Sequence, residues 1–497
     1  MEKAYLISVF VIATCGLVYE LISGALASYL LGDSVTQFSM VIGVYLFSMG
    51  IGSYLSKFIT KNLEETFIKV EIIVGLVGGS SAALLFFAFD FVEHFRVLLF
   101  SLVSIVGILV GLEIPLLMQL LKDRFEFRDL VAKVFTFDYV GALLASLLFP
   151  LVLVPQLGLV RSAFLFGILN VAVALWTIQV LGLKLGRFRK GYLSVAGICS
   201  LAYLVIGFAG ADRLTSFAET RNYQDTVIYA KSTKYQRIVV TRRGQDIRLH
   251  LNGNLQFSSR DEYRYHESLI HPGLAAHENA ESVLVLGGGD GMAVREILKY
   301  PNIKSITLVD LDEEMTSLFK NNQNLAALNQ KSQSDKVTII NQDAFQWLKA
   351  NDRQYDFIAV DFPDPSNFSI GKLYTNSFYK LLKNALRTDG IGVIQSTSPY
   401  VAKNSFWIIN RTLESVGFST TPFHAYVPSF GEWGFTIITN ETFRPAVQYP
   451  KDLRFVSKTT FQGMLEFPTD MMVDGPGVNR LNNQLLVRTF EEEWSHY

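Results

Sequence analysis

Long apolar segments dominate the first 210 residues of the chain. Each is long enough for a helix that crosses a bilayer, which takes about 20 residues, and short loops carrying most of the nearby charge separate them. The segments lie at 4–31, 38–58, 68–90, 95–121, 131–154, 159–182 and 191–210. This pattern predicts a multi-pass α-helical membrane domain of about seven transmembrane helices over residues 1–210.

The pattern changes after residue 210, where short segments of alternating polarity begin. YQRIVV at 235–240 and IRLHL at 247–251 are followed by the turn Asn252-Gly253-Asn254 and by LQF at 255–257. Such runs around an Asn-Gly turn are typical of hairpins, so we expect a small β-meander within residues 211–260. An amphipathic helix within YRYHESLIHPGLAAH follows it.

Strands and helices alternate over residues 261–445. The strands VLVLGGG, ITLVD, VTII, FIAVD and GIGVIQS are separated by helical segments such as MAVREILKYP, AFQWLKA and NSFYKLLKNAL. Because parallel strands are joined by helical crossovers, this order predicts a doubly wound, Rossmann-like α/β sheet of the methyltransferase type. Residues 446–497 follow as a C-terminal extension.

Acidic residues follow four of the predicted strands. They are Asp290, after a loop containing Gly287 and Gly289, then Asp310, Asp343 and Asp361, with Asp364 close behind. Ligands bind at the carboxyl ends of parallel strands, so we expect these carboxylates to converge on one cleft. A single such aspartate is more often a helix cap or turn residue, but four in register indicate a ligand site. Asp290 disfavours a pyrophosphate, because like charges would face each other, and favours a nucleoside with a positive group.

The overall charge and the cysteine content narrow the classes of partner. The formal net charge is −1, so no basic field would gather nucleic acid over the surface. Only Cys15 and Cys199 occur, both inside apolar segments, which excludes a disulfide framework and leaves no zinc-ligand spacing. We therefore expect neither a metal nor a nucleic-acid partner.

Acidic residues and glycines interrupt the apolar segments. The acids are Glu20, Glu71, Glu113 and Asp138. An uncompensated charge is costly there, so these residues indicate either a cation site or pairing with tyrosine, serine or one another between helices. The glycines, Gly43, Gly50, Gly52, Gly75, Gly78 and Gly79, indicate close helix packing.

In their order and spacing, the motifs of the second half resemble those of spermidine synthases. The matching pieces are YQRIVV, SSRDEYRYHE, VLVLGGGDGMAVREILKY, LVDLD, QDAF and DFPDP, within roughly residues 223–440. Each piece alone is common, but the combination is specific. The seven apolar segments, VPSFGEWGF at 427–435 and the tail NRLNNQLLV resemble the membrane-bound bacterial branch of this polyamine aminopropyltransferase family.

The resemblance implies that an aminopropyl group passes from decarboxylated S-adenosylmethionine, a co-substrate rather than a cofactor, to a diamine, giving spermidine and methylthioadenosine. Asp361 would be the catalytic acid–base residue. The donor site would contain Gln236, Gly287, Gly289, Asp290, Asp310 and Asp343, and the acceptor site Gln256, Tyr265, His266, Asp364 and Tyr426. The other expected partner is the lipid bilayer, and a homo-oligomer is compatible with these features.

Three departures from the usual spermidine synthases concern the acceptor. Asn252 replaces an aspartate, Asp310 replaces a glutamate, and SNFSIGKLY replaces a lid with Gly-Pro and is one residue longer. Putrescine is the default acceptor, with cadaverine, diaminopropane or spermidine as alternatives. Two other functions stay open. One is an S-adenosylmethionine-dependent methyltransferase, although acids in its pocket would repel the donor's carboxylate. The other is a polyamine transporter or sensor whose C-terminal half only binds.

Basic residues gather in the even-numbered loops of the membrane domain, which predicts a cytoplasmic N-terminus. They are Lys57, Lys61, Lys122, Arg124, Arg128, Lys133, Lys184, Arg187, Arg189 and Lys190. Seven crossings would then place the catalytic half outside, away from a cytosolic donor. Either one segment does not cross fully, or the charge rule fails, or the catalytic half is extracytoplasmic. We favour a multi-pass protein of the cell membrane with a cytoplasmic catalytic domain.

Overall fold

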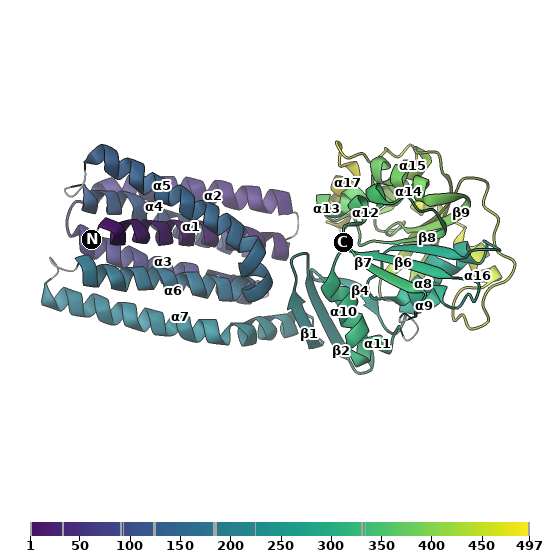
Figure 1. The fold of residues 1–497 in the computed structure, drawn as a ribbon, viewed down its shortest axis with the longest axis horizontal. Coiled ribbons are helices and arrows are strands. Elements are labelled where there is room, and N and C mark those ends of the chain that lie inside the picture. Colours follow the sequence, from purple (N-terminus) through teal and green to yellow (C-terminus); the bar gives the residue numbers. More distant parts are fainter. Residues whose placement is uncertain are drawn as a thin grey trace. The chain divides into compact units, whose positions relative to one another are not determined.

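The computed structural model describes residues 2–31, 34–89, 92, 94–122, 126–181, 186–223, 225–329, 332 and 334–495. The chain forms two compact units that divide after Gln236 (Figure 1). The first unit is almost entirely helical, and the second is an α/β unit.

Seven α-helices make up most of the described part of the first unit, and each contains most of one predicted apolar segment. They are α1 (Glu2–Leu31), α2 (Ser34–Leu55), α3 (Leu63–Ala88), α4 (Phe95–Leu121), α5 (Phe127–Leu148), α6 (Gly158–Leu181) and α7 (Arg187–Asn222), followed by strand β1 (Thr226–Ser232). Helix α7 continues past the predicted domain boundary at residue 210. Four positions named in the sequence analysis lie outside the described residues. They are residues 90 and 182, where two predicted apolar segments end, and the loop residues Arg124 and Lys184.

Six helical stretches of the described residues are long and apolar enough to cross a membrane. The fifth, Phe127–Gln179, is 53 residues long because a π-helical segment, Phe149–Leu157, joins α5 to α6. At full extension it would measure about 80 Å, against an apolar bilayer core of about 30 Å. Figure 1 shows the chain bending between α5 and α6, where Gly158 takes a positive φ of 73°. The count of about seven crossings therefore stays a prediction.

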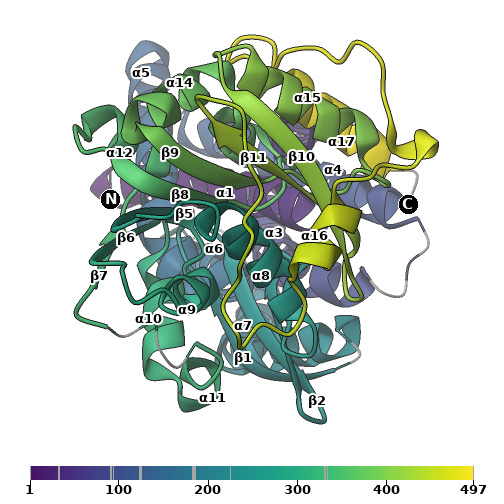
Figure 2. The same cartoon turned by 90° about the vertical axis from the view of Figure 1, so that its right-hand side faces the viewer.

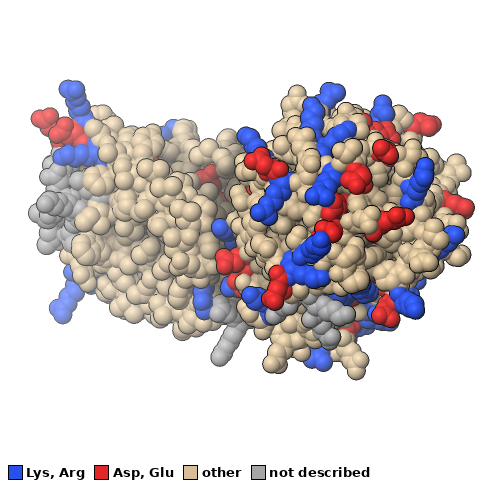
Figure 3. Space-filling model, turned by 45° about the vertical axis from the view of Figure 1, so that its right-hand side comes forward, with Lys and Arg blue, Asp and Glu red and all other residues tan. Residues whose placement is uncertain are grey.

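The surface and the packing of the helical unit fit an apolar environment. Figure 3 shows few charged side chains along most of its visible face. A Cβ added at Gly75 would lie 2.8 Å from the carbonyl oxygen of Gly167, so α3 and α6 approach closely there. The predicted packing role is thus confirmed for Gly75. A Cβ added at Gly43 or Gly50 would meet nothing within 4 Å among the described residues, so close packing is not seen at these two positions within this chain.

The predicted meander forms the start of the second unit. Strands β2 (Arg237–Arg243), β3 (Asp246–Leu251) and β4 (Asn254–Ser258) pair antiparallel in sequence. Asn252 and Gly253 both have positive φ, 51° and 85°, as the tight turn between β3 and β4 requires. The four-part division of the chain into domains nevertheless stays a prediction.

A seven-stranded sheet organises the rest of the second unit, in the order β10-β11-β9-β8-β5-β6-β7 (Figure 2). Neighbouring strands from β9 to β7 are parallel, whereas β10 and β11 are antiparallel. The strands are β5 (Ser282–Gly287), β6 (Ser305–Asp310), β7 (Val337–Asn341), β8 (Tyr355–Asp361), β9 (Leu386–Gln395), β10 (Ser419–Val427) and β11 (Gly431–Thr439). The predicted doubly wound α/β class is confirmed.

Helices cover both faces of this sheet, as Figure 2 shows. Successive residues of β8 belong to different cores: Phe357 and Ala359 pack on one face, Ile358 and Val360 on the other. Helices α8 (Glu262–Leu274), α9 (Met292–Ile297) and α16 (Lys458–Met464) cover the first face. Helices α12 (Ala344–Ala350), α14 (Asn376–Ala385), α15 (Lys403–Glu414) and α17 (Leu485–Trp494) cover the second. The shorter helices α10 (Glu313–Asn321), α11 (Gln323–Ala326) and α13 (Phe368–Gly371) lie in the connections.

Candidate active site

The centre of the site is the point where the strand order reverses, between β5 and β8. Gly287, the last residue of β5, is the register partner of Asp361, the last residue of β8. Gly287 has a φ of 81°, and a Cβ there would clash with the carbonyl oxygen of Asp361. Glycine is therefore required at this position. Ligands bind at such switch points in open α/β sheets.

Asp361 is held by a tyrosine from the neighbouring helix. The hydroxyl of Tyr265, on α8, donates a hydrogen bond of 2.5 Å to its Oδ1. Burial raises the pKa of Asp361 to about 6, the positive charge of His266 opposes this rise, and the negative charge of Asp290 adds to it. Such a pKa lies near neutral pH, where a carboxylate can accept a proton and release it again.

Asp364 lies three residues after Asp361, and a residue at the end of strand β9 orients its carboxylate. Its Oδ1 accepts a hydrogen bond of 2.8 Å from the amide of Gln395, the last residue of β9. The hydroxyl of Tyr374 donates to the other end of the same amide at 2.9 Å. Burial raises the pKa of Asp364 to about 6, against the effect of the Gln395 hydrogen bond.

Asp310 and Asp290 border the glycine loop. Asp310 accepts hydrogen bonds from the backbone amides of Gly289 at 3.0 Å and Asp312 at 2.9 Å. Burial raises the pKa of Asp310 to about 6 despite these bonds, and the charge of Asp290 adds to the rise. Asp290 is 8% exposed, and its carboxylate accepts a hydrogen bond from the backbone of Met292 at 2.9 Å, at the start of α9.

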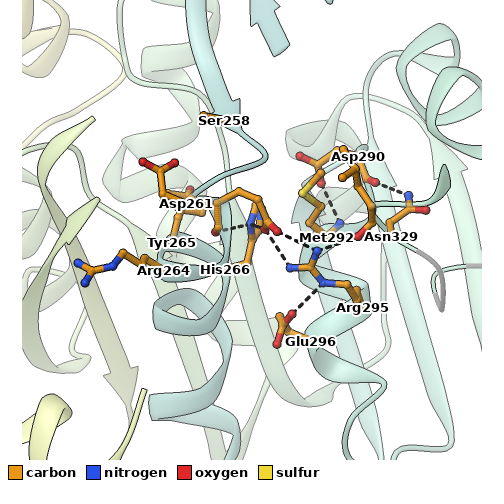
Figure 4. A network of polar contacts seen from close by, with 12 residues as sticks. Ser258, Asp261, Arg264, Tyr265, His266, Asp290, Met292, Arg295, Glu296 and Asn329 are labelled. Carbon is orange, nitrogen blue, oxygen red and sulfur yellow. Dashed lines mark hydrogen bonds and ion pairs between the residues drawn. The ribbon is translucent and has the colours of Figure 1, made fainter. Parts of the chain in front are cut away.

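His266 is a buried cation beside these acids. Its Nδ1 lies 2.8 Å from a carboxylate oxygen of Glu262, which also binds Arg295 at 2.9 Å. Figure 4 shows His266 and Arg295 in this network. Burial alone would lower the pKa of His266, but Glu262, followed by Asp290 and Asp361, raises it to about 9. The ring therefore stays protonated at neutral pH and offsets part of the negative charge of the acids.

Asp343 caps α12 and is already paired. Its Oδ1 accepts from the backbone of Gln346 at 3.0 Å, and its Oδ2 lies 2.6 Å from the ammonium group of Lys372. Partial burial would raise the pKa of Asp343, but these bonds lower it below its ordinary value. Lys372 belongs to the segment SNFSIGKLY, so this segment is tied to the carboxyl end of β7.

The structure does not bring every predicted residue into this cluster. Gln256 donates to the carbonyl of Asn254 on its own strand at 3.3 Å. Tyr426, on β10, is 54% exposed, and its carbonyl oxygen accepts a hydrogen bond of 2.6 Å from Arg264. Gln236 is the last residue of the first unit. The binding roles of Gln256, Tyr426 and Gln236 stay predictions.

Several residues of the site were not singled out from sequence, Gln395, Glu262 and Arg295 among them. Gln395 ends β9 just as Asp361 ends β8, so the same strand-end rule would have found it. Glu262 and Arg295 lie inside the matching motifs, but only the fold shows that they fix the charge of a histidine. Among the described residues, no group of three or more His, Cys, Asp or Glu side chains is arranged to hold a metal ion.

Comparisons with known proteins identify the family of the chain. Residues 262–449 match the spermine/spermidine synthase domain. A polyamine aminopropyltransferase of Leptospira interrogans is 51% identical over 496 residues, covering 100% of this chain and 99% of the relative. Polyamine aminopropyltransferase 2 of Ralstonia nicotianae is 53% identical, with 98% and 97% covered. A solved spermidine synthase in complex with the transition state analogue AdoDATO is 23% identical, with a TM-score of 0.46 over 49% of this chain and 85% of that one. Because full-length relatives share half of its residues, the chain belongs to the polyamine aminopropyltransferase family.

Proposed function

We propose that this protein transfers an aminopropyl group from decarboxylated S-adenosylmethionine to a diamine, with putrescine as the default acceptor. The observation that carries the proposal is a set of four aspartates: Asp290, Asp310 and Asp361 border the glycine loop, and Asp364 follows three residues after Asp361. Burial raises the pKa of the last three of these carboxyls, and a positively charged ligand would stabilise their ionised forms. Both substrates of this reaction are cationic.

Asp361 is the base in the proposed mechanism. The donor supplies a methylene carbon activated by the adjacent sulfonium. A neutral amine nitrogen forms a bond to this carbon, the carbon–sulfur bond breaks, and its electron pair stays on sulfur to give methylthioadenosine. The nitrogen must lose one proton, and Asp361 accepts or relays it. Tyr265 holds the carboxylate in position with its 2.5 Å hydrogen bond.

The other acids position the substrates. Asp310 is suited to the ribose hydroxyls, because a carboxylate accepts two donors, and it lies against the backbone of Gly289. Asp364, fixed by Gln395, is suited to a second ammonium group of the acceptor. Holding nitrogen, carbon and sulfur in line accounts for a large share of the rate enhancement in such a reaction. No cofactor or metal takes part in this proposal.

The runner-up function is methyl transfer from S-adenosylmethionine. Its donor has an additional carboxylate, which Asp290 and Asp361 would repel. Full-length protein in detergent, incubated with decarboxylated S-adenosylmethionine and a panel of diamines, should release methylthioadenosine. Calorimetry should give tighter binding of the decarboxylated donor than of S-adenosylmethionine. Equal affinities, or methylation without methylthioadenosine release, would refute the proposal.

The location of the protein is part of the same proposal. The six apolar helical stretches support a multi-pass membrane protein, and the cytosolic origin of the donor favours a cytoplasmic catalytic unit. Alkaline phosphatase fused after Tyr497 should therefore be inactive, and a cytoplasmic reporter fused there should be active. Phosphatase activity would place the catalytic unit outside.

A further inference from the structure

Five helices of the first unit bring polar side chains together inside its apolar core. None of these side chains is more than 8% exposed, and each lies within electrostatic or hydrogen-bonding range of at least one other member. They are Cys15, Tyr19 and Glu20 on α1, Tyr45 on α2, Glu71 on α3, Glu113 on α4 and Asn170 on α6. The polar cluster, as we call this set, contains three acids and no base.

Hydrogen bonds fix one of the acids. The hydroxyl of Tyr19 donates to Oδ1 of Asn170 at 3.0 Å, and the amide of Asn170 donates to Oε2 of Glu71 at 2.9 Å. The two bonds run in one direction and end on the carboxyl group of Glu71. Glu71 is therefore held as a hydrogen-bond acceptor, which is the role that suits an ionised carboxylate.

Glu113 has no such support. It is 1% exposed, it lies within electrostatic range of Glu71, and neither of its oxygens has a hydrogen-bond partner in the described part of the bundle. Oε1 of Glu71 is likewise without a partner. Burying one ion costs several kcal/mol, and two like charges would repel each other as well. The two carboxyl groups together therefore need at least one positive charge.

Close packing decides which positive charge fits. A Cβ at Gly16 would lie 2.8 Å from Val110, three residues before Glu113. One at Gly78 would lie 2.7 Å from the ring of Tyr19. These two contacts show that α1 packs closely against α4 and α3 near the pair, which favours a small cation over the methylene chain of an amine. A proton is the only cation that needs no cavity.

We propose that Glu71 and Glu113 form a proton-binding pair in the core of the helical unit, with Glu71 held as the acceptor and Glu113 carrying an exchangeable proton. Acids within apolar helices are typical of proton relays in pumps and transporters. A helical unit that only anchors an enzyme has no need of such a pair. The inference does not depend on the proposed transferase activity.

Dicyclohexylcarbodiimide tests the proposal, because it enters apolar regions and reacts with protonated carboxyl groups. The acid proton passes to a carbodiimide nitrogen, the carboxyl oxygen adds to the central carbon, and acyl migration leaves a stable N-acylurea. Full-length protein in detergent is labelled over a pH series, and peptide mass spectrometry locates the adduct. Glu113 should be labelled at acidic pH, with labelling falling about tenfold for each pH unit above its midpoint.

Three variants with glutamine in place of glutamate are compared with the wild-type protein in this labelling experiment. Glu113→Gln should abolish this labelling, and Glu71→Gln should lower its pH midpoint, because a neighbouring negative charge is removed. Glu65→Gln is the matched control: it lies on α3 like Glu71 but is paired with Lys69 at 2.7 Å, and its loss should change nothing. Labelling of Glu113 that does not vary with pH would overturn the proposal, since the proton would then be permanent.

Infrared difference spectroscopy covers the case in which the reagent does not reach Glu113. A neutral carboxylic acid band that disappears as the pH rises, and that Glu113→Gln lacks, would support the proposal. The absence of any such band would overturn it. If Glu113→Gln does not elute as a folded protein, Glu113→Asp and Glu71→Gln take its place, and each should shift the pH at which the band disappears.

Discussion

Removing the hydroxyl of Tyr265 tests how a single hydrogen bond sets the pKa of Asp361, the proposed base. In Tyr265→Phe, Asp361 loses the 2.5 Å hydrogen bond to its Oδ1 and keeps its neighbours His266 and Asp290. Because this bond stabilises the ionised form, its loss must raise the pKa of Asp361. A hydrogen bond to a charged group contributes about 1.5–3 kcal/mol. At 1.36 kcal/mol for each pKa unit, the rise is about 1–2 units.

The pH profile of kcat/KM measures this shift. In the wild-type protein, burial places the pKa of Asp361 at about 6, so activity should fall as the pH drops through that value and the base becomes protonated. In Tyr265→Phe the acidic limb should move up to about pH 7–8, from the same arithmetic, and activity should recover towards the wild-type level above it. Methylthioadenosine release by full-length protein in detergent provides the assay.

Tyr374→Phe is the matched control. It removes another buried hydroxyl of the site, one that bonds Gln395 rather than Asp361. Its acidic limb should stay near that of the wild type. An unmoved limb in Tyr265→Phe, or an equal shift in both variants, would show that the limb does not report the Tyr265–Asp361 bond.

Three further predictions concern other parts of the catalytic unit. Asp361→Asn should lower turnover by about 10²–10⁴-fold with donor binding and thermal midpoint nearly unchanged, and near wild-type turnover would remove Asp361 from the mechanism. The folded-state pKa of His266, about 9, exceeds its unfolded value of about 6.5. Its charge therefore contributes at most about 3 kcal/mol to the free energy of unfolding below pH 6.5, and this contribution is lost as the pH rises through 9. The thermal midpoint of the wild-type protein should fall over this pH window, and that of Glu262→Gln should fall less. Asn479→Ala should raise the acceptor KM more than the donor KM, because the fully buried Asn479 donates to the carbonyls of Gly371 and Tyr374 in SNFSIGKLY, the segment whose departure from the family pattern we associate with the acceptor. Asn483→Ala, which removes a bond to Val478 instead, should leave both KM values unchanged.

The sequence by itself determined the elements and their chemical character. Apolar runs of membrane-spanning length became helices α1 to α7, and strands ending in Asp310 and Asp361 became neighbours of β5 in one sheet. These features are local, since periodicity and strand-end position depend on adjacent residues. The predicted reaction and the roles of the individual site residues came from the family motifs.

Tertiary structure decided the features that depend on residues far apart in the chain. The protonated state of His266 depends first on Glu262, one helical turn away, and then on Asp290 and on Asp361, 95 residues away. Lys372 pairs with Asp343, 29 residues earlier in the chain, only because the fold brings the two segments together. Burial and the electrostatics of packed groups arise from such non-local contacts, whereas the sequence pattern specifies only which side chains are available to make them.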